Sequence, residues 1–195
     1  MHSYLIRFFD ILFSLSGLIL GFPILLIITL LGLLDTGAPI FCQQRVGHFK
    51  RPFILVKFRT MKPNTAHVAS HLASSSAVTS LGRILRKTKL DELPQLWNVL
   101  KGEMSLVGPR PCLYNQHQLI DEREKRAVFR VRPGITGLAQ INAIDMSTPQ
   151  LLAKTDAQMI KDLTITKYFY YIVLTFLGRG LGDRVDNTKQ KKDDL

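Results

Sequence analysis

The longest apolar segment of the chain covers residues 11–34, where Ser14, Ser16 and Thr29 are the polar exceptions and no charged residue occurs. As a straight α-helix, these 24 residues would be roughly 36 Å long, and the hydrocarbon core of a bilayer is about 30 Å thick. The pattern therefore predicts a membrane-associated helix. Residues 1–10 are amphipathic and are expected at the membrane surface.

The middle of this segment contains Gly17, Gly21 and Pro23. A proline inside a helix removes a backbone N–H and clashes with the carbonyl four residues back, so a kink or break is predicted at Pro23. A kinked spanning helix is the simpler interpretation of the residues, and a re-entrant helix that enters and leaves on one face is the alternative. A cleaved signal peptide does not fit, because the run is too long and no small-x-small cleavage site follows it.

Beyond residue 36 the apolar positions fall into short segments. Residues 39–44 and 53–58 are predicted to be strands joined by a hairpin-like connection at 47–52. Residues 64–80 are rich in Ser, Ala and Thr and predict a loop. His67 and His71 in that loop are interpreted as solvated histidines, because no third metal ligand is evident near them.

Helical periodicity marks four later segments, at 81–101, 113–129, 148–161 and 165–177. Thr88 stands three residues before Asp91, a capping-box-like signal that predicts a break near Thr88 in the first segment. The last segment is rich in aromatic residues and is expected in the core or at the membrane interface. The stretches 108–111 and 132–137 contain Gly and Pro and are predicted to be irregular.

The net charge of +11 is concentrated in one part of the chain, because residues 36–90 contain ten Lys or Arg and no Asp or Glu. Basic residues accumulate on the cytoplasmic side of membranes and attract anionic lipid headgroups. Residues 36–195 are therefore expected in the cytoplasm, at the membrane surface. The two cysteines, Cys42 and Cys112, have neither a metal-ligand spacing nor that of a disulfide framework.

Two adjacent carboxylates, Asp91 and Glu92, end this basic region at the expected start of a helix. The helix dipole and the nearby basic residues favour the ionised form of Asp91. An ionised, anchored aspartate can attack phosphorus to give an acyl-phosphate. Glu92 could hold a divalent ion, usually Mg²⁺, on phosphate oxygens. The alternative is an ordinary acidic first turn that faces water.

Two groups of basic residues suit an anionic substrate. Lys57 and Arg59 point to the same face of a strand, where they could bind a diphosphate, although a solvated strand face is the alternative. Arg110 lies between Pro109 and Pro111, whose fixed φ angles present its guanidinium rigidly. A structural turn in which Arg110 pairs with a carboxylate is the alternative.

Taken together, these motifs resemble the bacterial monotopic phosphoglycosyl transferases, the small PglC-like membrane enzymes of glycoconjugate assembly. The resemblance extends from about residue 4 to residue 182. Its most specific blocks are residues 57–61, 86–99, 102–111 and 132–140. Several long blocks in the same order argue against a chance match.

The resemblance implies transfer of a sugar-1-phosphate from a UDP-sugar to undecaprenyl phosphate with release of UMP, the first membrane step of surface glycoconjugate biosynthesis. Asp91 would be the nucleophile, forming a covalent phosphosugar intermediate in a ping-pong cycle, and Glu92 its partner associated with Mg²⁺. An N-acetylated deoxyamino sugar is the expected donor sugar. The candidate substrate-binding residues are Lys57, Arg59, Arg86, Pro109, Arg110 and Arg132.

Family members have a re-entrant helix broken at a proline step, which Pro23 matches, so the resemblance favours the re-entrant topology. The predicted fold is α+β, with a re-entrant, kinked membrane helix and a small, mostly helical domain that has a short β-hairpin and interfacial amphipathic helices. Its parts are a membrane-associated helix-break-helix at 1–35, a cytoplasmic catalytic domain at 36–182 and a polar, disordered tail at 183–195. The expected location is the bacterial inner membrane, with the catalytic domain on the cytoplasmic face.

Two departures from the family pattern bear on sugar specificity rather than on the reaction. Many members have Asn-Gly-Arg where this chain has Asn142, Ala143 and Ile144, and a usual glycine of the hairpin is replaced near Lys50. The expected partners are a UDP-sugar, undecaprenyl phosphate and the bilayer, with no nucleic acid; a homodimer is left open. Two other functions remain: a membrane-tethered basic module that binds anions without catalysis, and a metal-dependent phosphohydrolase.

Overall fold

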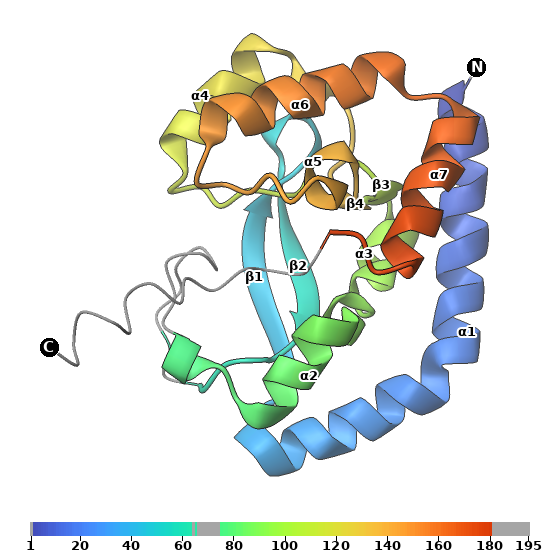
Figure 1. The fold of residues 1–195 in the computed structure, drawn as a ribbon. Helices are drawn as coiled ribbons and strands as arrows, with labels where there is room; N and C mark the ends of the chain where they lie inside the picture. Colours follow the sequence, from blue (N-terminus) through green and yellow to red (C-terminus); the bar gives the residue numbers. More distant parts are fainter. Residues whose placement is uncertain (1, 64, 66–74, 181–195) are drawn as a thin grey trace, which may run out of the picture.

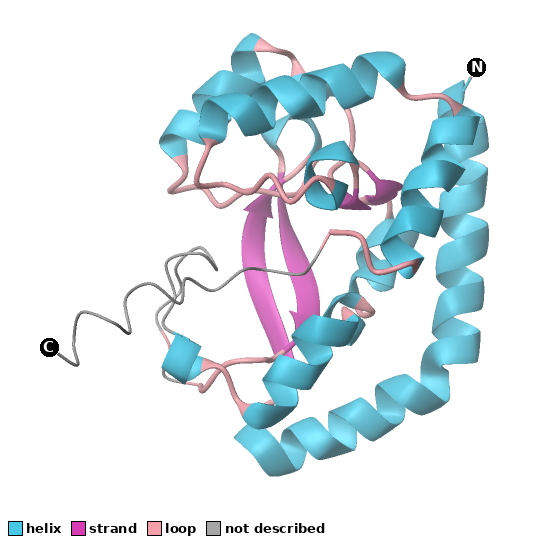
Figure 2. Cartoon of the chain, in the orientation of Figure 1, coloured by secondary structure: helices cyan, strands magenta, loops and turns pink. Residues whose placement is uncertain are grey.

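The computed structural model describes residues 2–63, 65 and 75–180. The loop predicted at 64–80, with His67 and His71, lies mostly outside these residues, and the tail predicted at 183–195 lies wholly outside them. A mostly helical α+β fold with a short hairpin is confirmed. The helices and strands are α1 (His2–Thr36), β1 (Ile40–Val46), β2 (Pro52–Phe58), α2 (Ser80–Thr88), α3 (Gln95–Lys101), β3 (Ser105–Val107), α4 (His117–Lys125), β4 (Gly134–Thr136), α5 (Leu138–Ile141), α6 (Pro149–Asp162) and α7 (Ile165–Phe176) (Figure 1 and Figure 2).

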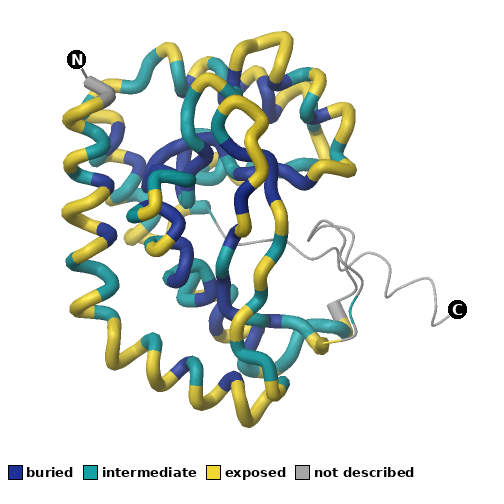
Figure 3. Tube along the Cα trace, turned by 180° about the vertical axis from the view of Figure 1, so that it is seen from behind, coloured by how far each residue is buried: buried dark blue, intermediate teal, exposed yellow. Residues whose placement is uncertain are grey.

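Helix α1 runs along one edge of the molecule and bends near its middle (Figure 1). The helix is continuous through Pro23, so the predicted helix-break-helix is instead a bend within one helix. A proline favours such a bend because it lacks a backbone N–H and crowds the preceding turn. Only 11% of the apolar 18-residue window in α1 is buried inside the molecule, and Figure 3 shows exposed and half-buried positions along its whole length. By length and composition α1 could cross a membrane.

Arg7 attaches the N-terminal arm of α1 to the end of α3. Its guanidinium donates from Nη1 to the Val99 carbonyl at 2.6 Å and from Nη2 to the Leu100 carbonyl at 2.9 Å. The last carbonyls of a helix have no partner within the helix, and a cation there also interacts favourably with the helix dipole. Arg7 therefore caps α3 from outside.

Asp10 attaches the same arm to β3 and α7. Its side chain is 1% exposed, and Oδ1 accepts hydrogen bonds from the Ser105 hydroxyl at 3.0 Å, the Leu106 N–H at 2.9 Å and the Tyr168 hydroxyl at 2.8 Å. Burial and, after it, the charge of Asp10 raise the pKa of Tyr168, so the phenol stays protonated as a donor. A buried carboxylate is stable only when it is paired or hydrogen-bonded, and these bonds therefore fix α1 against the domain.

The C-terminal arm of α1 is held by apolar contacts. Ile28 packs with Phe58 of β2 and Leu85 of α2 in a small buried cluster. Gly32 allows a close approach, because a Cβ there would lie 2.8 Å from the Cβ of Pro39. Both arms of α1 therefore contact the same domain.

The hairpin is confirmed, with β1 and β2 antiparallel and Phe41 paired with Lys57. A parallel pair, β3 with β4, was not predicted, and β4 falls in the stretch 132–137 that was expected to be irregular. Each of these strands has three residues, too few for an alternating pattern to be recognised. Helices α4 and α6 lie together over one end of the hairpin, and α3 and α7 lie between the hairpin and α1 (Figure 1).

The predicted break near Thr88 is confirmed, but its predicted role as an N-cap is wrong. Thr88 ends α2, and its hydroxyl donates to the Ile84 carbonyl at 2.9 Å, a partner inside the preceding helix. Lys89, with a left-handed φ of 58°, then turns the chain. Helix α4 is shorter at both ends than the predicted 113–129. It begins at His117, and it ends at Lys125, before Ala127, which is also left-handed, with φ of 56°. Helices α6 and α7 agree with their predicted bounds to within one residue.

Candidate active site

The two predicted catalytic carboxylates lie on a 3₁₀ turn, Leu90–Glu92, that links α2 to α3. Asp91 is 5% exposed, and Glu92 is half-buried. The turn precedes α3, so Asp91 does not lie in the first turn of a long helix as the capping signal predicted.

Glu92 is joined to Arg110 across the site. Oε1 of Glu92 lies 2.8 Å from Nη2 of Arg110, and the two side chains are 12% and 27% exposed. The pair connects the carboxylate turn to the Gly-Pro-Arg-Pro loop that follows β3. This pairing with a carboxylate was the structural alternative for Arg110. An arginine has five N–H donors, so one ion pair leaves room for a phosphate as well.

A small, partly open hollow lies beside this ion pair. Three cationic side chains contribute to it, and Gln95, four residues after Asp91, adds an amide. A concave surface with this charge suits a compact anion such as a diphosphate. The lining residues are Arg45, Leu55, Lys57, Gln95, Arg110, Pro111 and Gly134.

Arg45 was missed by the sequence reasoning. Residues two apart on a strand share a face, and the hairpin register places Phe41, opposite Lys57, on the same face as Arg45. Arg45 and Lys57 are both buried and both line the hollow. Aligning the two predicted strands around their connection could have placed Arg45 on the same face as Lys57, four positions further along the hairpin.

Arg59 and Arg86 are engaged elsewhere. Arg59 donates to the Ala38 carbonyl at 2.7 Å, so it holds the beginning of β1, and its guanidinium lies over the Phe41 ring. Lys57 lies over the same ring, so the predicted shared face is confirmed. Arg86 donates from Nε to the Thr60 hydroxyl at 2.9 Å. Neither arginine lines the hollow.

Arg132 and Pro109 both take part in hydrogen bonds that involve backbone groups. The Nε of Arg132 donates to the Gly102 carbonyl at 2.8 Å, at the end of α3 opposite the carboxylate turn. Pro109 is buried, and its carbonyl accepts the Gly134 N–H at 2.9 Å. The structure thus brings Arg110 and Lys57 to one hollow, and Arg110 joins that hollow to Glu92. Asp91 and Glu92 are not among its lining residues, and the Nε of Arg132 lies at the other end of α3.

Lys89 adds a cation immediately before the carboxylate turn. Its ammonium donates to the Arg179 carbonyl at 2.7 Å, which ties the turn to the segment after α7. Burial lowers the pKa of Lys89, and nearby Arg110 lowers it further, whereas Glu92 raises it. The carboxylates therefore stand in a positive environment.

The residues of the site fit a magnesium ion only together with a substrate. No three His, Cys, Asp or Glu side chains gather at a metal-binding distance within residues 2–63, 65 and 75–180. Asp91 and Glu92 supply two carboxylates, and one Glu92 oxygen is bonded to Arg110. Mg²⁺ is commonly held by one or two carboxylates plus substrate phosphate oxygens and water, which is compatible with this pair.

The two departures from the family pattern fall at special backbone positions. Lys50, near the position of the usual hairpin glycine, has φ of 60°, and Ala143, in place of the glycine of Asn-Gly-Arg, has φ of 55°. Glycine adopts this left-handed conformation without the cost that a side chain imposes. Both residues thus adopt the left-handed conformation that glycine adopts most easily.

Comparison with known proteins identifies the class. The chain matches the family profile described as bacterial sugar transferase over residues 1–179. The chain belongs to this family of bacterial sugar transferases, and the resemblance found in its motifs is confirmed. It is 43% identical over 137 residues to the uncharacterized sugar transferase EpsL of Bacillus subtilis, covering 70% of this chain and 67% of EpsL.

Two further relatives carry names that specify a reaction. The undecaprenyl-phosphate glucose phosphotransferase of Komagataeibacter xylinus is 42% identical over 159 residues, covering 77% of this chain and 29% of that protein. The UDP-galactose-lipid carrier transferase of Erwinia amylovora is 38% identical, covering 71% of this chain and 32% of that protein. The match therefore spans less than a third of these two longer relatives.

Proposed function

We propose that this chain transfers a sugar-1-phosphate from a UDP-sugar to undecaprenyl phosphate. The observation that carries the proposal is the Glu92–Arg110 ion pair beside a hollow with three cationic side chains. Names of two relatives, an undecaprenyl-phosphate phosphotransferase and a UDP-galactose-lipid carrier transferase, support the same chemistry. The names of relatives include glucose, galactose and N-acetylgalactosamine as the transferred sugar. The N-acetylated deoxyamino sugar remains a prediction.

In the first step a carboxylate oxygen of Asp91 attacks the phosphorus that carries the sugar. The bond from this phosphorus to the bridging oxygen breaks, UMP leaves with that oxygen, and the sugar phosphate remains on Asp91. Arg110, Lys57 and Arg45 are positioned to neutralise the charge of the diphosphate as it is cleaved. Asp91 is 5% exposed, and its burial limits access of water to the acyl-phosphate.

In the second step an oxygen of undecaprenyl phosphate attacks the same phosphorus. The bond to Asp91 breaks and its carboxylate is regenerated. The product is the lipid diphosphate that carries the sugar. Glu92, with phosphate oxygens of the substrate, would hold Mg²⁺, which would neutralise part of the phosphate charge. Arg110 keeps Glu92 oriented in both steps through the 2.8 Å ion pair.

The bent α1 supports a re-entrant topology on the cytoplasmic face. Its N-terminal arm bonds to α3, β3 and α7, and its C-terminal arm packs on β2 and α2. A helix that crossed the bilayer would place its two ends on opposite sides and could not contact one domain with both arms. The basic residues of the domain favour the cytoplasmic side. The lipid phosphate would then meet the site at the membrane surface.

Intact-protein mass spectrometry tests the reaction. The protein is incubated with Mg²⁺ and UDP-glucose, UDP-galactose, UDP-N-acetylgalactosamine or a UDP-linked N-acetylated deoxyamino sugar, without lipid acceptor. We expect a mass gain of one sugar phosphate with the correct donor and none in Asp91→Asn. Asp121→Asn, which changes an exposed aspartate of α4, is the matched control and should still gain the mass.

Other outcomes separate the alternatives. Release of sugar phosphate into water without acceptor would favour a phosphohydrolase. Binding of donors without an adduct, and without UMP release after undecaprenyl phosphate is added to folded protein, would favour an anion-binding module and contradict the proposal.

Cysteine labelling tests the topology. Tyr4 and Leu34 are 86% and 87% exposed near the two ends of α1. Each is changed to cysteine in a background carrying Cys42→Ser and Cys112→Ala, and membrane vesicles of known orientation are treated with an impermeant maleimide. A re-entrant helix predicts labelling of both positions from the cytoplasmic side, whereas labelling from opposite sides would mean a spanning helix.

A further inference from the structure

The backbone carbonyls of the loop that contains Arg110 accept hydrogen bonds that fix the loop in place. Pro109 and Pro111 have no N–H, so the loop cannot be fixed by donors of its own at those residues. Four successive carbonyls instead accept hydrogen bonds from other elements of the fold. The donors are the Gly134 N–H to Pro109 at 2.9 Å, Nη1 of Arg123 to Arg110 at 2.8 Å, Nη1 of Arg45 to Pro111 at 3.1 Å and the Val46 N–H to Cys112 at 3.0 Å.

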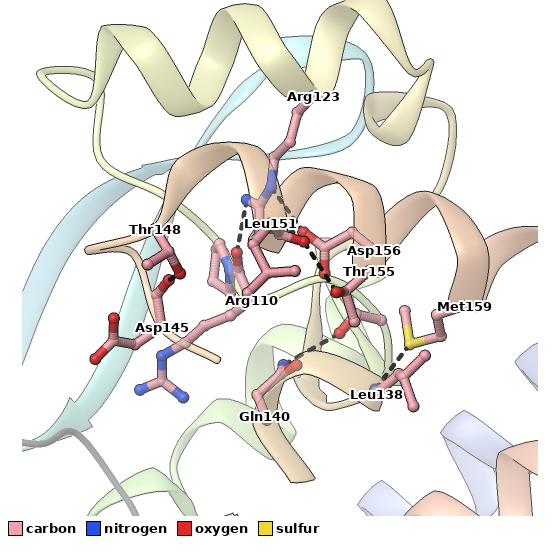
Figure 4. Close-up of polar contacts among 12 residues, drawn as sticks. Arg110, Arg123, Leu138, Gln140, Asp145, Thr148, Leu151, Thr155, Asp156 and Met159 are labelled. Carbon is pink, nitrogen blue, oxygen red and sulfur yellow. Dashed lines mark hydrogen bonds and ion pairs between the residues drawn. The ribbon is translucent and has the colours of Figure 1, made fainter. Parts of the chain in front are cut away.

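The donor to Arg110 belongs to a buried ion pair between α4 and α6. Arg123 is 1% exposed and Asp156 is 0% exposed. Nε and Nη2 of Arg123 donate to Oδ2 of Asp156 at 3.0 and 2.7 Å. Figure 4 shows the Arg110 carbonyl turned toward Arg123, whereas the Arg110 guanidinium points away from the pair. One arginine therefore connects two helices to the backbone of a second arginine that reaches the active site.

Stability alone does not account for this pair. Burying two charges is costly, and an apolar pair of similar volume often serves the fold as well or better. Oδ1 of Asp156 is buried and has no hydrogen-bond partner among the described residues, an additional cost. An arginine does offer what an apolar residue lacks, namely a planar fork that orients several donors at once.

We propose that Arg123 and Asp156 are a positioning pair for Arg110. Asp156 orients the guanidinium of Arg123, Arg123 holds the Arg110 carbonyl, and the Arg110 side chain is thereby placed against Glu92. Neither residue of the pair touches the hollow. This role rests on the proposed transferase function, because its consequence is the rate at which Asp91 becomes loaded with sugar phosphate.

The test compares variants of the pair with variants that loosen the same helices elsewhere. Arg123→Met removes both sets of hydrogen bonds, Asp156→Asn keeps the shape, and Arg123→Lys keeps the charge but not the fork. Leu119→Ala in α4 and Leu152→Ala in α6 are the matched controls, because both leucines are buried in one apolar cluster. Thermal midpoints are measured for all variants, and rates are compared at a temperature where each is folded.

The expected result is a loss of kcat of about tenfold or more in Arg123→Met, because small misplacements of catalytic groups are costly. KM for the donor should change less than kcat, Arg123→Lys should recover part of the rate, and neither leucine variant should lose kcat. Asp156→Asn covers the case in which Arg123→Met fails to fold. Wild-type kcat in folded Arg123→Met or Asp156→Asn, or equal losses in the leucine variants, would overturn the proposal.

Hydrogen–deuterium exchange gives a readout that does not need turnover. Backbone exchange in peptides covering 105–113 should rise in Arg123→Met and stay unchanged in the leucine variants. If the wild-type protein forms no adduct with any donor and releases no UMP with undecaprenyl phosphate, the transferase function fails, and this measurement still tests the positioning. Equal exchange in all variants would then overturn it.

Discussion

Arginine side chains lie at both ends of α3, but they meet different acceptors there, a carboxylate at one end and backbone carbonyls at the other. At the N-terminal end, Arg110 pairs with Glu92 and lines the hollow. At the C-terminal end, Arg7 donates to the carbonyls of Val99 and Leu100. Arg132 donates to the carbonyl of Gly102, the residue that follows the helix. An arginine at the first end can act on a substrate anion, whereas one at the second end stabilises a helix. The type of residue is the same, and the acceptor it meets decides its role.

The largest expected effect is at the N-terminal end. Arg110→Met should lower turnover about 100-fold, the cost typical of losing one donor to a developing charge, with little change in the thermal midpoint. UMP release in the presence of undecaprenyl phosphate measures it. Arg126→Met, which removes an arginine paired with Glu122 on α4, is the matched control. Near-normal turnover in Arg110→Met would mean that Arg110 does not act on the substrate anion.

Arg7→Met should destabilise the protein by about 2 kcal/mol, because a charged donor to two carbonyls of α3 is lost. Thermal or denaturant unfolding in detergent micelles measures the change. Turnover per folded molecule should stay close to normal. A large loss of turnover in protein that is as stable as wild type would mean that this end of α3 also takes part in the reaction.

Arg45→Met should lower kcat/KM for the UDP-sugar about tenfold, a smaller effect than that of Arg110→Met, because Arg45 lines the hollow but Glu92 keeps its partner. Comparing kcat with KM for the UDP-sugar separates loss of binding from loss of rate. We expect mainly a higher KM. An unchanged kcat/KM would remove Arg45 from the anion-binding surface.

The smallest effect is expected for Arg132→Met, a loss of about 1 kcal/mol of stability, because its Nε makes one hydrogen bond to the end of α3. Turnover per folded molecule should be unchanged. The substrate-binding role implied by the family resemblance predicts the reverse, a large loss of turnover at constant stability. This variant therefore decides between the two roles.

Long periodic segments were predicted well, because their signal is repeated many times. Helices α6 and α7 and the hairpin appear where the apolar pattern placed them. Strands β3 and β4 were missed, because three residues in stretches rich in Gly and Pro show no period. Thr88 misled the cap assignment, because the same hydroxyl can bond to the backbone before it or after it.

The sequence predicted the candidate-site residues that form a recognisable pattern with their immediate sequence neighbours. The adjacent Asp91 and Glu92 and the proline-flanked Arg110 stand out in one dimension, and the structure joins Glu92 with Arg110. Arg123 does not stand out, because its partner Asp156 is 33 residues away and only the packing of α4 on α6 brings them together. Basic residues were numerous, and the sequence also offered Arg59, Arg86 and Arg132, none of which lines the hollow.

The hydrogen bonds of Asp10 can form only late in translation, because their donors are synthesised long after Asp10. This carboxylate lies in α1, but its donors Ser105 and Tyr168 are 95 and 158 residues further along the chain. At about 5 to 20 residues per second, the ribosome needs roughly 8 to 30 seconds to reach the second donor. During that interval the helix carries a charge without its final partners, and a charge in hydrocarbon is costly. We therefore expect α1 to remain at the lipid headgroups on the nascent chain and to settle into its final depth only after α7 has been translated.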